Sequence, residues 1–173
     1  MCHGIHDPAV VEGAGRAVRE RLAVPPDGRL WLTRDGRATT YSGLVAQAGE
    51  PSARWALLRS ADGHRLDVAW ADLGALTPAN PGFATVLAHA RLVRGVPVVG
   101  LAAPLGRVAS AWAATARTGR TRILATAVEA VAAVMLAAPA VPRDGLLPEE
   151  HDRARIVLAS ALRLAGMPAP THV

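Results

Sequence analysis

The amino-acid sequence predicts a single α+β domain spanning residues 1–173. Two patterns support this fold class. Apolar residues recur at three- and four-residue steps near the N-terminus and through the second half, as they do in amphipathic helices. Between residues 29 and 76 the apolar period shortens to two and Asp-Gly pairs interrupt it, which is typical of strands joined by tight turns. We therefore expect an N-terminal helix, a four-stranded antiparallel meander and a helical C-terminal half.

The first helix is expected over residues 7–24. Asp7 offers a side-chain oxygen to cap the helix, and Pro8 fits the first helical position because it has no N–H to leave unpaired. The apolar stripe that follows consists of Val11, Ala14, Val18 and Leu22. The run Pro25-Pro26-Asp27-Gly28 then ends the helix and begins a turn.

Four strands are expected over residues 29–76, arranged as two hairpins. The first hairpin turns at Asp35-Gly36 and the second at Asp62-Gly63, because Asp-Gly tolerates the positive φ values of the primed turns. The strands would occupy Leu30 to Thr33, Ala38 to Val45, Arg54 to Ser60 and Arg65 to Leu73. This layout resembles small SH3-like or Sm-like barrels, and we take the resemblance as an indication of the fold only.

The helical half is expected over residues 81–166, with about four helices. It follows a break at Thr77 to Gly82, where proline and glycine cluster. Besides the segment 97–120, the expected helices run from Phe83 to near Gly95, from Thr121 to Ala137, and from Pro148 to Gly166. Residues 123–142 carry only Glu129 as a charge, and their high alanine content favours a buried helix over a membrane span.

The composition indicates a basic intracellular protein. All 19 basic residues are arginine, the net charge is +5, and clustered arginine favours an anionic partner. The alternative is that these arginines form an ordinary solvated surface in a protein from a GC-rich genome. Cys2 is the single cysteine and cannot form an internal disulfide, which fits the cytoplasm. No secretory signal is visible at the N-terminus, and we expect no membrane association.

The sequence contains no catalytic signature, phosphate-binding glycine loop or paired-cysteine motif. We expect no metal and no cofactor, because the histidines are scattered and His3 and His6 lie with Cys2 at an expected frayed terminus. His89 is interpreted as a structural histidine. Glu129 is interpreted as a solvent-facing or arginine-paired carboxylate, whose pKa would rise if it were buried alone. These observations favour a protein that is not an enzyme.

The segment Pro97 to Arg120 carries the one order of residues that suggests a function. Leu101, Ala102 and Leu105 share a helical face, Gly106 can adopt positive φ, and an apolar stretch with Trp112 follows. This order resembles the helix-turn-helix of small DNA-binding regulators and excisionase-like proteins, in which L-A-x-x-L-G opens the turn. The matching residues are Leu101, Ala102, Leu105, Gly106 and Ala116 to Arg120. Pro104 departs from the pattern, since it falls inside the expected first helix.

The resemblance implies a DNA-binding protein with a regulatory or accessory role, acting as a homodimer. Phosphate contacts with modest sequence specificity are expected along an arginine-rich edge. The residues expected to bind nucleic acid are Arg107, Ser110, Arg117, Thr118, Arg120 and Arg122.

Three alternatives remain open from the sequence. The segment could be an alanine-rich helical hairpin within the core. The protein could be a protein-interaction or small-ligand module, for which an exposed apolar patch around Trp31 or Trp55 is expected. It could also be a small enzyme with a pocket between the strand-rich and helical halves, to which His89 and Glu129 contribute.

Overall fold

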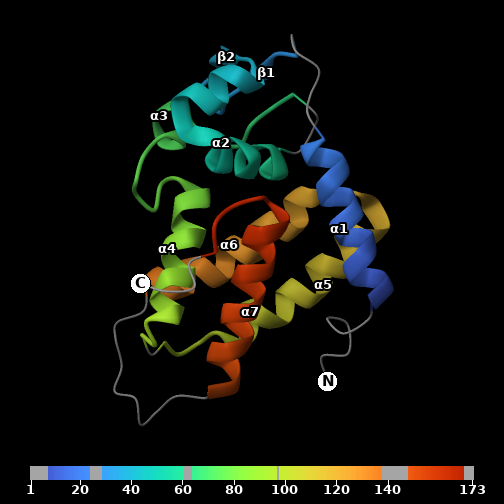
Figure 1. Cartoon of the computed structure of the whole chain (residues 1–173), viewed down its shortest axis with the longest axis vertical. Helices are drawn as coiled ribbons and strands as arrows, with labels where there is room; N and C mark the ends of the chain where they lie inside the picture. The colour runs from blue at the N-terminus through green and yellow to red at the C-terminus, as the bar shows by residue number, and fades with distance from the viewer. Residues whose placement is uncertain (1–7, 24–28, 61–63, 97, 138–147, 170–173) are drawn as a thin grey trace.

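The computed structural model describes residues 8–23, 29–60, 64–96, 98–137 and 148–169. These ranges form seven helices and one antiparallel sheet of two short strands (Figure 1). The elements are α1 Pro8–Leu22, β1 Trp31–Leu32, β2 Ala38–Thr39, α2 Tyr41–Arg59, α3 Trp70–Leu73, α4 Pro81–Val93, α5 Ala102–Thr118, α6 Thr121–Ala137 and α7 Pro148–Leu164. The expected α+β class with a four-stranded meander is therefore wrong, because the described chain is mostly helical.

The first expected hairpin forms, but it is short. Trp31 pairs with Thr39 and Leu32 with Ala38, and Gly36 adopts a φ of 84° in the turn between the strands. The second strand stops there because the Thr40 hydroxyl accepts a hydrogen bond from the Gly43 amide at 3.1 Å and caps α2. The chain therefore enters a helix where the sequence predicts a strand.

The strand expected over Arg54 to Ser60 is the second part of α2 instead. Trp55 and Leu58 pack into the larger hydrophobic cluster, whereas Ala56 and Leu57 pack into a smaller one beneath the hairpin. A helix buried on two sides gives a continuous apolar run, which period alone does not distinguish from a strand. The turn expected at Asp62-Gly63 lies outside the described residues.

The remaining parts of the expected meander are also not strands. Arg65 makes an isolated parallel bridge with Leu32, and Trp70 to Leu73 form the short helix α3. The loop expected near Gly49 is a kink inside α2, where Gly49 has a φ of 74° and a ψ of 157°. Pro51 follows in the next helical turn. Glycine suits this backbone conformation because it has no Cβ.

The second half contains four helices, and α6 lies at its centre. In Figure 1 α6 runs behind α7, with α4 on one side and α1 and α5 on the other. It contacts all of these helices and also α2. Its buried face comprises Thr121, Leu124, Ala125, Val128, Val131, Ala132 and Met135. Within the described ranges, none of the helices combines the length and apolar composition that crossing a bilayer requires.

The turn expected at Gly106 is absent, and this removes the spacing on which the helix-turn-helix resemblance depends. Helix α5 runs without interruption from Ala102 to Thr118, and Gly106 is not among the glycines with positive φ. Pro104 does not break this helix, because it lies in the first turn, where a backbone N–H has no intrahelical acceptor. The turn lies instead at Gly119, which ends α5 with a φ of 70°.

The two glycines provide a direct test of where the chain turns. A Cβ at either position would meet no atom within 4 Å, so only the backbone conformation separates them. Gly106→Ala is expected to raise the free energy of unfolding by about 0.5–1 kcal/mol, because glycine is unfavourable inside a helix. Gly119→Ala is expected to lower it by about 1–2 kcal/mol, because alanine resists the left-handed conformation. Urea denaturation measures the free energy of unfolding of both variants. If Gly106→Ala is less stable than the unmodified protein, Gly106 lies in a turn and not inside a helix.

Candidate functional site

The six residues expected to bind nucleic acid are all exposed. Arg107, Ser110, Arg117 and Thr118 follow one another at three-, seven- and one-residue steps along α5, so they share its solvent face. Arg120 lies in the turn after Gly119, and Arg122 lies in the first turn of α6. The expected arginine edge is therefore at the surface, on a continuous helix and the turn that follows it.

The arginines of this edge differ in their partners. Arg122 forms an ion pair with Asp67 at 2.9 Å. Arg107, Arg117 and Arg120 form no ion pair with any residue of the described ranges. Among the described residues, these three guanidinium groups have no carboxylate partner, whereas Arg122 is paired with Asp67.

The sites expected under the two other functional alternatives do not form as expected. Trp31 and Trp55 are each 2% exposed, so the expected apolar patch around them is absent. His89 and Glu129 do not share a pocket, because they line two separate cavities. Cys2, His3 and His6 lie outside the described residues. No group of three or more His, Cys, Asp or Glu side chains within the described ranges is arranged to hold a metal ion.

Glu129 is held in a polar network inside the fold. Its carboxylate accepts a hydrogen bond from the Trp55 indole N–H at 2.8 Å and forms an ion pair with Arg59 at 3.3 Å. Burial raises the pKa of the Glu129 carboxyl, and Arg59 opposes that effect. Arg59 also contacts Asp67 at 3.5 Å. The network joins α6 to α2 and to the loop after α2, so Glu129 has a structural role as an arginine-paired carboxylate.

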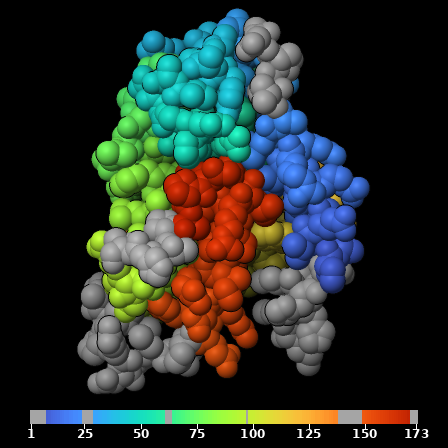
Figure 2. Space-filling view, in the orientation of Figure 1, coloured from blue at the N-terminus to red at the C-terminus, as the bar shows by residue number. Residues whose placement is uncertain are grey.

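His89 lies at a different and larger cavity, between α4 and α7. Figure 2 shows α7 running along the surface of the molecule, flanked by α4 on one side and α1 on the other. The cavity has a volume of about 600 Å³, and we refer to it as the α4–α7 cavity. Its polar residues are His89, His151, Asp152, Arg155, Ser160 and Arg163, and its apolar residues include Leu92, Val93, Ile156, Ala159 and Ala169.

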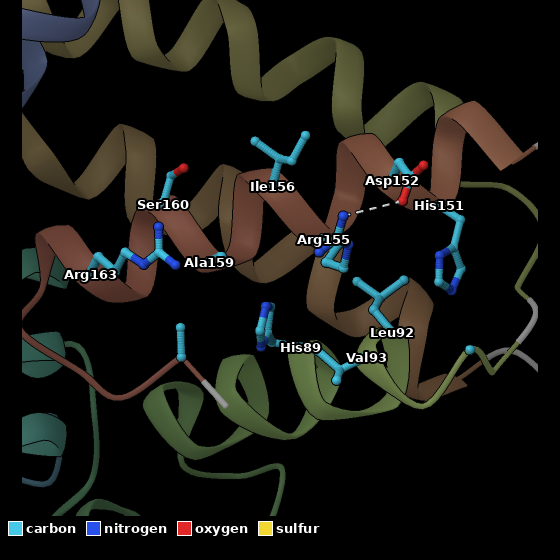
Figure 3. Close-up of a pocket in the computed structure, with 12 residues that line it drawn as sticks. His89, Leu92, Val93, His151, Asp152, Arg155, Ile156, Ala159, Ser160 and Arg163 are labelled. Atoms are coloured by element: carbon cyan, nitrogen blue, oxygen red, sulfur yellow. Dashed lines mark hydrogen bonds and ion pairs between the residues drawn. The ribbon is translucent and has the colours of Figure 1, made fainter. Parts of the chain in front are cut away.

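The positions of these side chains follow from helix geometry. Asp152, Arg155, Ile156, Ala159, Ser160 and Arg163 recur at three- and four-residue steps on α7 and so lie on one face. His89 projects toward that face from α4 and lies between the side chains of Arg155 and Arg163 (Figure 3). The cavity therefore brings two arginines of one helix to a histidine of another.

The electrostatics of the cavity leave positive charge without a partner. Arg155 contacts Asp152 at 3.5 Å, whereas Arg163 makes no ion pair among the described residues. His89 is only 3% exposed, and its Nδ1 atom has no hydrogen-bond partner within the described part of the chain. Burial lowers the pKa of His89, and the nearby positive charges of Arg155 and Arg163 lower it further. The ring therefore binds a proton less readily than an ordinary histidine does.

Sequence reasoning singled out His89 but missed Arg155, Ser160 and Arg163. Their helical spacing on α7 was a signal for one polar face. That signal could not show which face of α7 meets α4, because this depends on packing between segments far apart in the chain.

The chain matches no protein-family model, no curated protein and no solved structure. Its function is therefore argued from the geometry of its own residues.

Proposed function

We propose that the protein binds a small organic anion in the α4–α7 cavity. The observation that carries this proposal is His89, a buried side chain that has an unpartnered Nδ1 atom and lies between two arginines. Leaving a buried polar atom without a hydrogen bond costs about 1–3 kcal/mol. A bound anion would supply both an acceptor for this histidine and a counter-charge for the arginines.

The dimensions and lining of the cavity fit a small ligand. Its volume of about 600 Å³ lies within the range of about 300–1,000 Å³ that is usual for such sites. Leucine, valine, isoleucine and alanine side chains line it together with a few polar groups, the combination common in small-molecule sites. An anion with an apolar part would use both kinds of surface.

A thermal-shift series with eight-carbon compounds tests this proposal. Octanoate and octyl phosphate are anions, octanol is neutral and octylamine is a cation, so the apolar part stays constant while the charge changes. The anions are expected to raise the melting temperature progressively as their concentration exceeds Kd, and the other two compounds are not. The proposal fails if neither anion raises the melting temperature, or if octanol raises it as much as they do.

A second candidate function is binding of the nucleic-acid backbone by the solvent face of α5. The observation that favours it is the exposure of Arg107, Arg117 and Arg120 without ion pairs, in a protein of net charge +5. Arginine binds phosphate groups along a nucleic acid without reading its sequence. Helix α6, which follows the turn at Gly119, is packed against five other helices and so cannot enter a groove of the duplex; only backbone contacts are inferred.

A pair of double variants tests this second candidate. Arg107→Ala/Arg117→Ala removes two charges from the α5 face, and Arg94→Ala/Arg153→Ala removes two exposed charges elsewhere. The two double variants have equal net charge, because each loses two arginines from a protein of net charge +5. The α5 variant is expected to lower the slope of log K against log salt by about 1.8 for a labelled duplex, since each phosphate contact contributes about 0.9.

Fluorescence anisotropy at several salt concentrations measures these slopes. The control variant is expected to keep the slope of the unmodified protein. Equal slopes for the two variants, or no binding of the duplex even at low salt, would exclude this function for the α5 face.

A further inference from the structure

The groups of the α4–α7 cavity indicate a more specific ligand than an organic anion in general, and this inference rests on the proposed function. We propose that the ligand is an amphipathic carboxylate whose anionic group lies between Arg163 and His89, and that His89 takes up a proton from solvent when the ligand binds.

The first step concerns where negative charge is missing. Arg155 and Arg163 are eight residues apart on α7, which corresponds to about 12 Å along the helix axis. Asp152 already contacts Arg155 at 3.5 Å. Arg163 has no carboxylate partner among the described residues, so the uncompensated charge lies at its end of the cavity. An anionic group is most stabilised there.

The second step concerns the hydrogen bonds of His89. A carboxylate has two oxygens that only accept hydrogen bonds, so one oxygen suits Arg163 and the other suits a histidine N–H. His89 lies between Arg155 and Arg163 in Figure 3 and is 3% exposed, and its Nδ1 atom has no hydrogen-bond partner within the described part of the chain. A single carboxylate in this position would serve both side chains. It would therefore compensate the charge of Arg163, which has no ion pair among the described residues.

The third step is the linkage between ligand and proton. In the free protein, burial and then the charges of Arg155 and Arg163 hold the pKa of His89 below its ordinary value. A carboxylate offsets the charge of Arg163 and attracts the imidazolium, so it raises the pKa of His89 in the complex. Between these two pKa values, binding adds a proton to the ring. Affinity must then increase as the pH falls through this window and become constant on either side.

Most other charged groups on the helices around α4 already have partners away from the cavity, so we assign the proton uptake to His89. Those that line the cavity from α7 are His151, Asp152, Arg155 and Arg163. On the remaining helices packed against α4, the charges pair elsewhere: Glu129 of α6 contacts Arg59 of α2, and Arg54 of α2 contacts Glu50. On α4 itself, Arg91 donates a hydrogen bond to the Leu136 carbonyl. His151 is the second imidazole of the cavity, and the test must separate it from His89.

The apolar part of the ligand follows from the rest of the lining. Ile156 is 57% exposed although it is a large aliphatic side chain, and Val93 and Ala159 belong to the same cavity lining. Covering such a side chain removes apolar surface from water and favours binding. An aliphatic chain attached to the carboxylate would lie along these residues, which makes the ligand amphipathic.

Isothermal titration calorimetry with octanoate tests this inference. The titration is run at each pH in two amine buffers whose ionisation enthalpies differ, such as bis-Tris and imidazole at the lower pH values and triethanolamine and Tris at the higher ones, because an anionic buffer would compete with octanoate. The pH runs from about 5.5 to 8.5, a range that brackets the ordinary pKa of histidine. The unmodified protein is expected to take up as much as one proton per ligand within the window. Its affinity is expected to rise by as much as tenfold for each unit by which the pH falls there.

The matched variant is His89→Asn, whose side-chain amide keeps an N–H donor but does not titrate. It is expected to bind octanoate without proton uptake and with an affinity independent of pH. Proton uptake that persists in this variant would place the proton on another group, such as His151, and would overturn the inference.

The remaining outcomes separate the inference from the proposed function. Binding of octanoate to the unmodified protein without proton uptake at any pH would overturn the inference and leave anion binding intact. Binding of octyl phosphate but not of octanoate would overturn the carboxylate class alone. If no anion binds, both the proposed function and the inference fail.

Discussion

Replacing Arg163 with alanine is expected to weaken the binding of octanoate by roughly 10- to 150-fold. A hydrogen bond to a charged group contributes about 1.5–3 kcal/mol, and about 1.4 kcal/mol corresponds to a tenfold change in affinity. Arg163 is the exposed arginine of the cavity without an ion pair, so its removal leaves no described carboxylate unpaired. Calorimetry of the variant and the unmodified protein under the same buffer conditions measures the difference.

Two controls accompany this result. Arg16→Ala removes one exposed arginine from α1, outside the cavity, and is expected to keep the affinity of the unmodified protein. The melting temperature of Arg163→Ala without ligand is expected to stay close to that of the unmodified protein, because surface substitutions change stability by about 0.5 kcal/mol or less. An unchanged affinity in Arg163→Ala would show that the anion does not bind at this end of the cavity.

Replacing Trp112 with alanine is expected to lower the free energy of unfolding by about 3–5 kcal/mol. The sequence associated Trp112 with a DNA-reading helix, but its side chain is 6% exposed and belongs to the larger hydrophobic cluster. Removing a large aromatic side chain from such a cluster takes away its burial and leaves a cavity. A loss of this size is a large fraction of the total stability of a domain, about 5–15 kcal/mol.

Urea denaturation of Trp112→Ala beside Ser110→Ala measures this effect on one helix. Ser110 lies on the solvent face of α5, and its substitution is expected to change the free energy of unfolding by about 0.5 kcal/mol or less. Similar midpoints for the two variants would contradict the orientation of α5 described above.

Local signals predicted the ends of several helices. Pro8 begins α1 and Pro148 begins α7, as expected for a residue that suits the first helical position. Gly95 and Gly166 each have a φ of 69° after the helices that they follow, as expected for glycine beyond a helix end. These features depend on a few neighbouring residues, so the sequence contains the information directly.

The region from Ala38 to Leu73 could not be predicted in the same way. Its secondary structure depends on two hydrophobic clusters that meet at α2, one containing Trp55 and the other containing Leu57. The alternation of apolar residues is compatible with strands when each segment is considered alone. Helix α2 is stabilised by burial on both of its sides. This burial depends on how the whole chain packs, so it cannot be predicted from the segment alone.

The candidate site was predicted only in part for the same reason. The arginines of the expected edge on α5 are exposed, whereas their binding to nucleic acid stays a prediction. The sequence singled out His89 but not Arg155 and Arg163, the two arginines that line the same cavity. These arginines lie on α7, which is far from His89 in the sequence. The prediction of a turn at Gly106 was wrong, because Pro104 lies in the first turn of α5 and does not interrupt the helix.

The most direct test of the account is a nuclear magnetic resonance titration of protein with ¹⁵N-labelled histidine. The imidazole signals of His89, assigned by comparison with His89→Asn, are followed as octanoate is added near neutral pH. These signals are expected to move toward the imidazolium position as the cavity fills, and Arg163→Ala is expected to require far more octanoate to reach the same change. Octanoate that raises the melting temperature while the His89 signals stay unchanged would contradict the account, because the anion would then bind elsewhere.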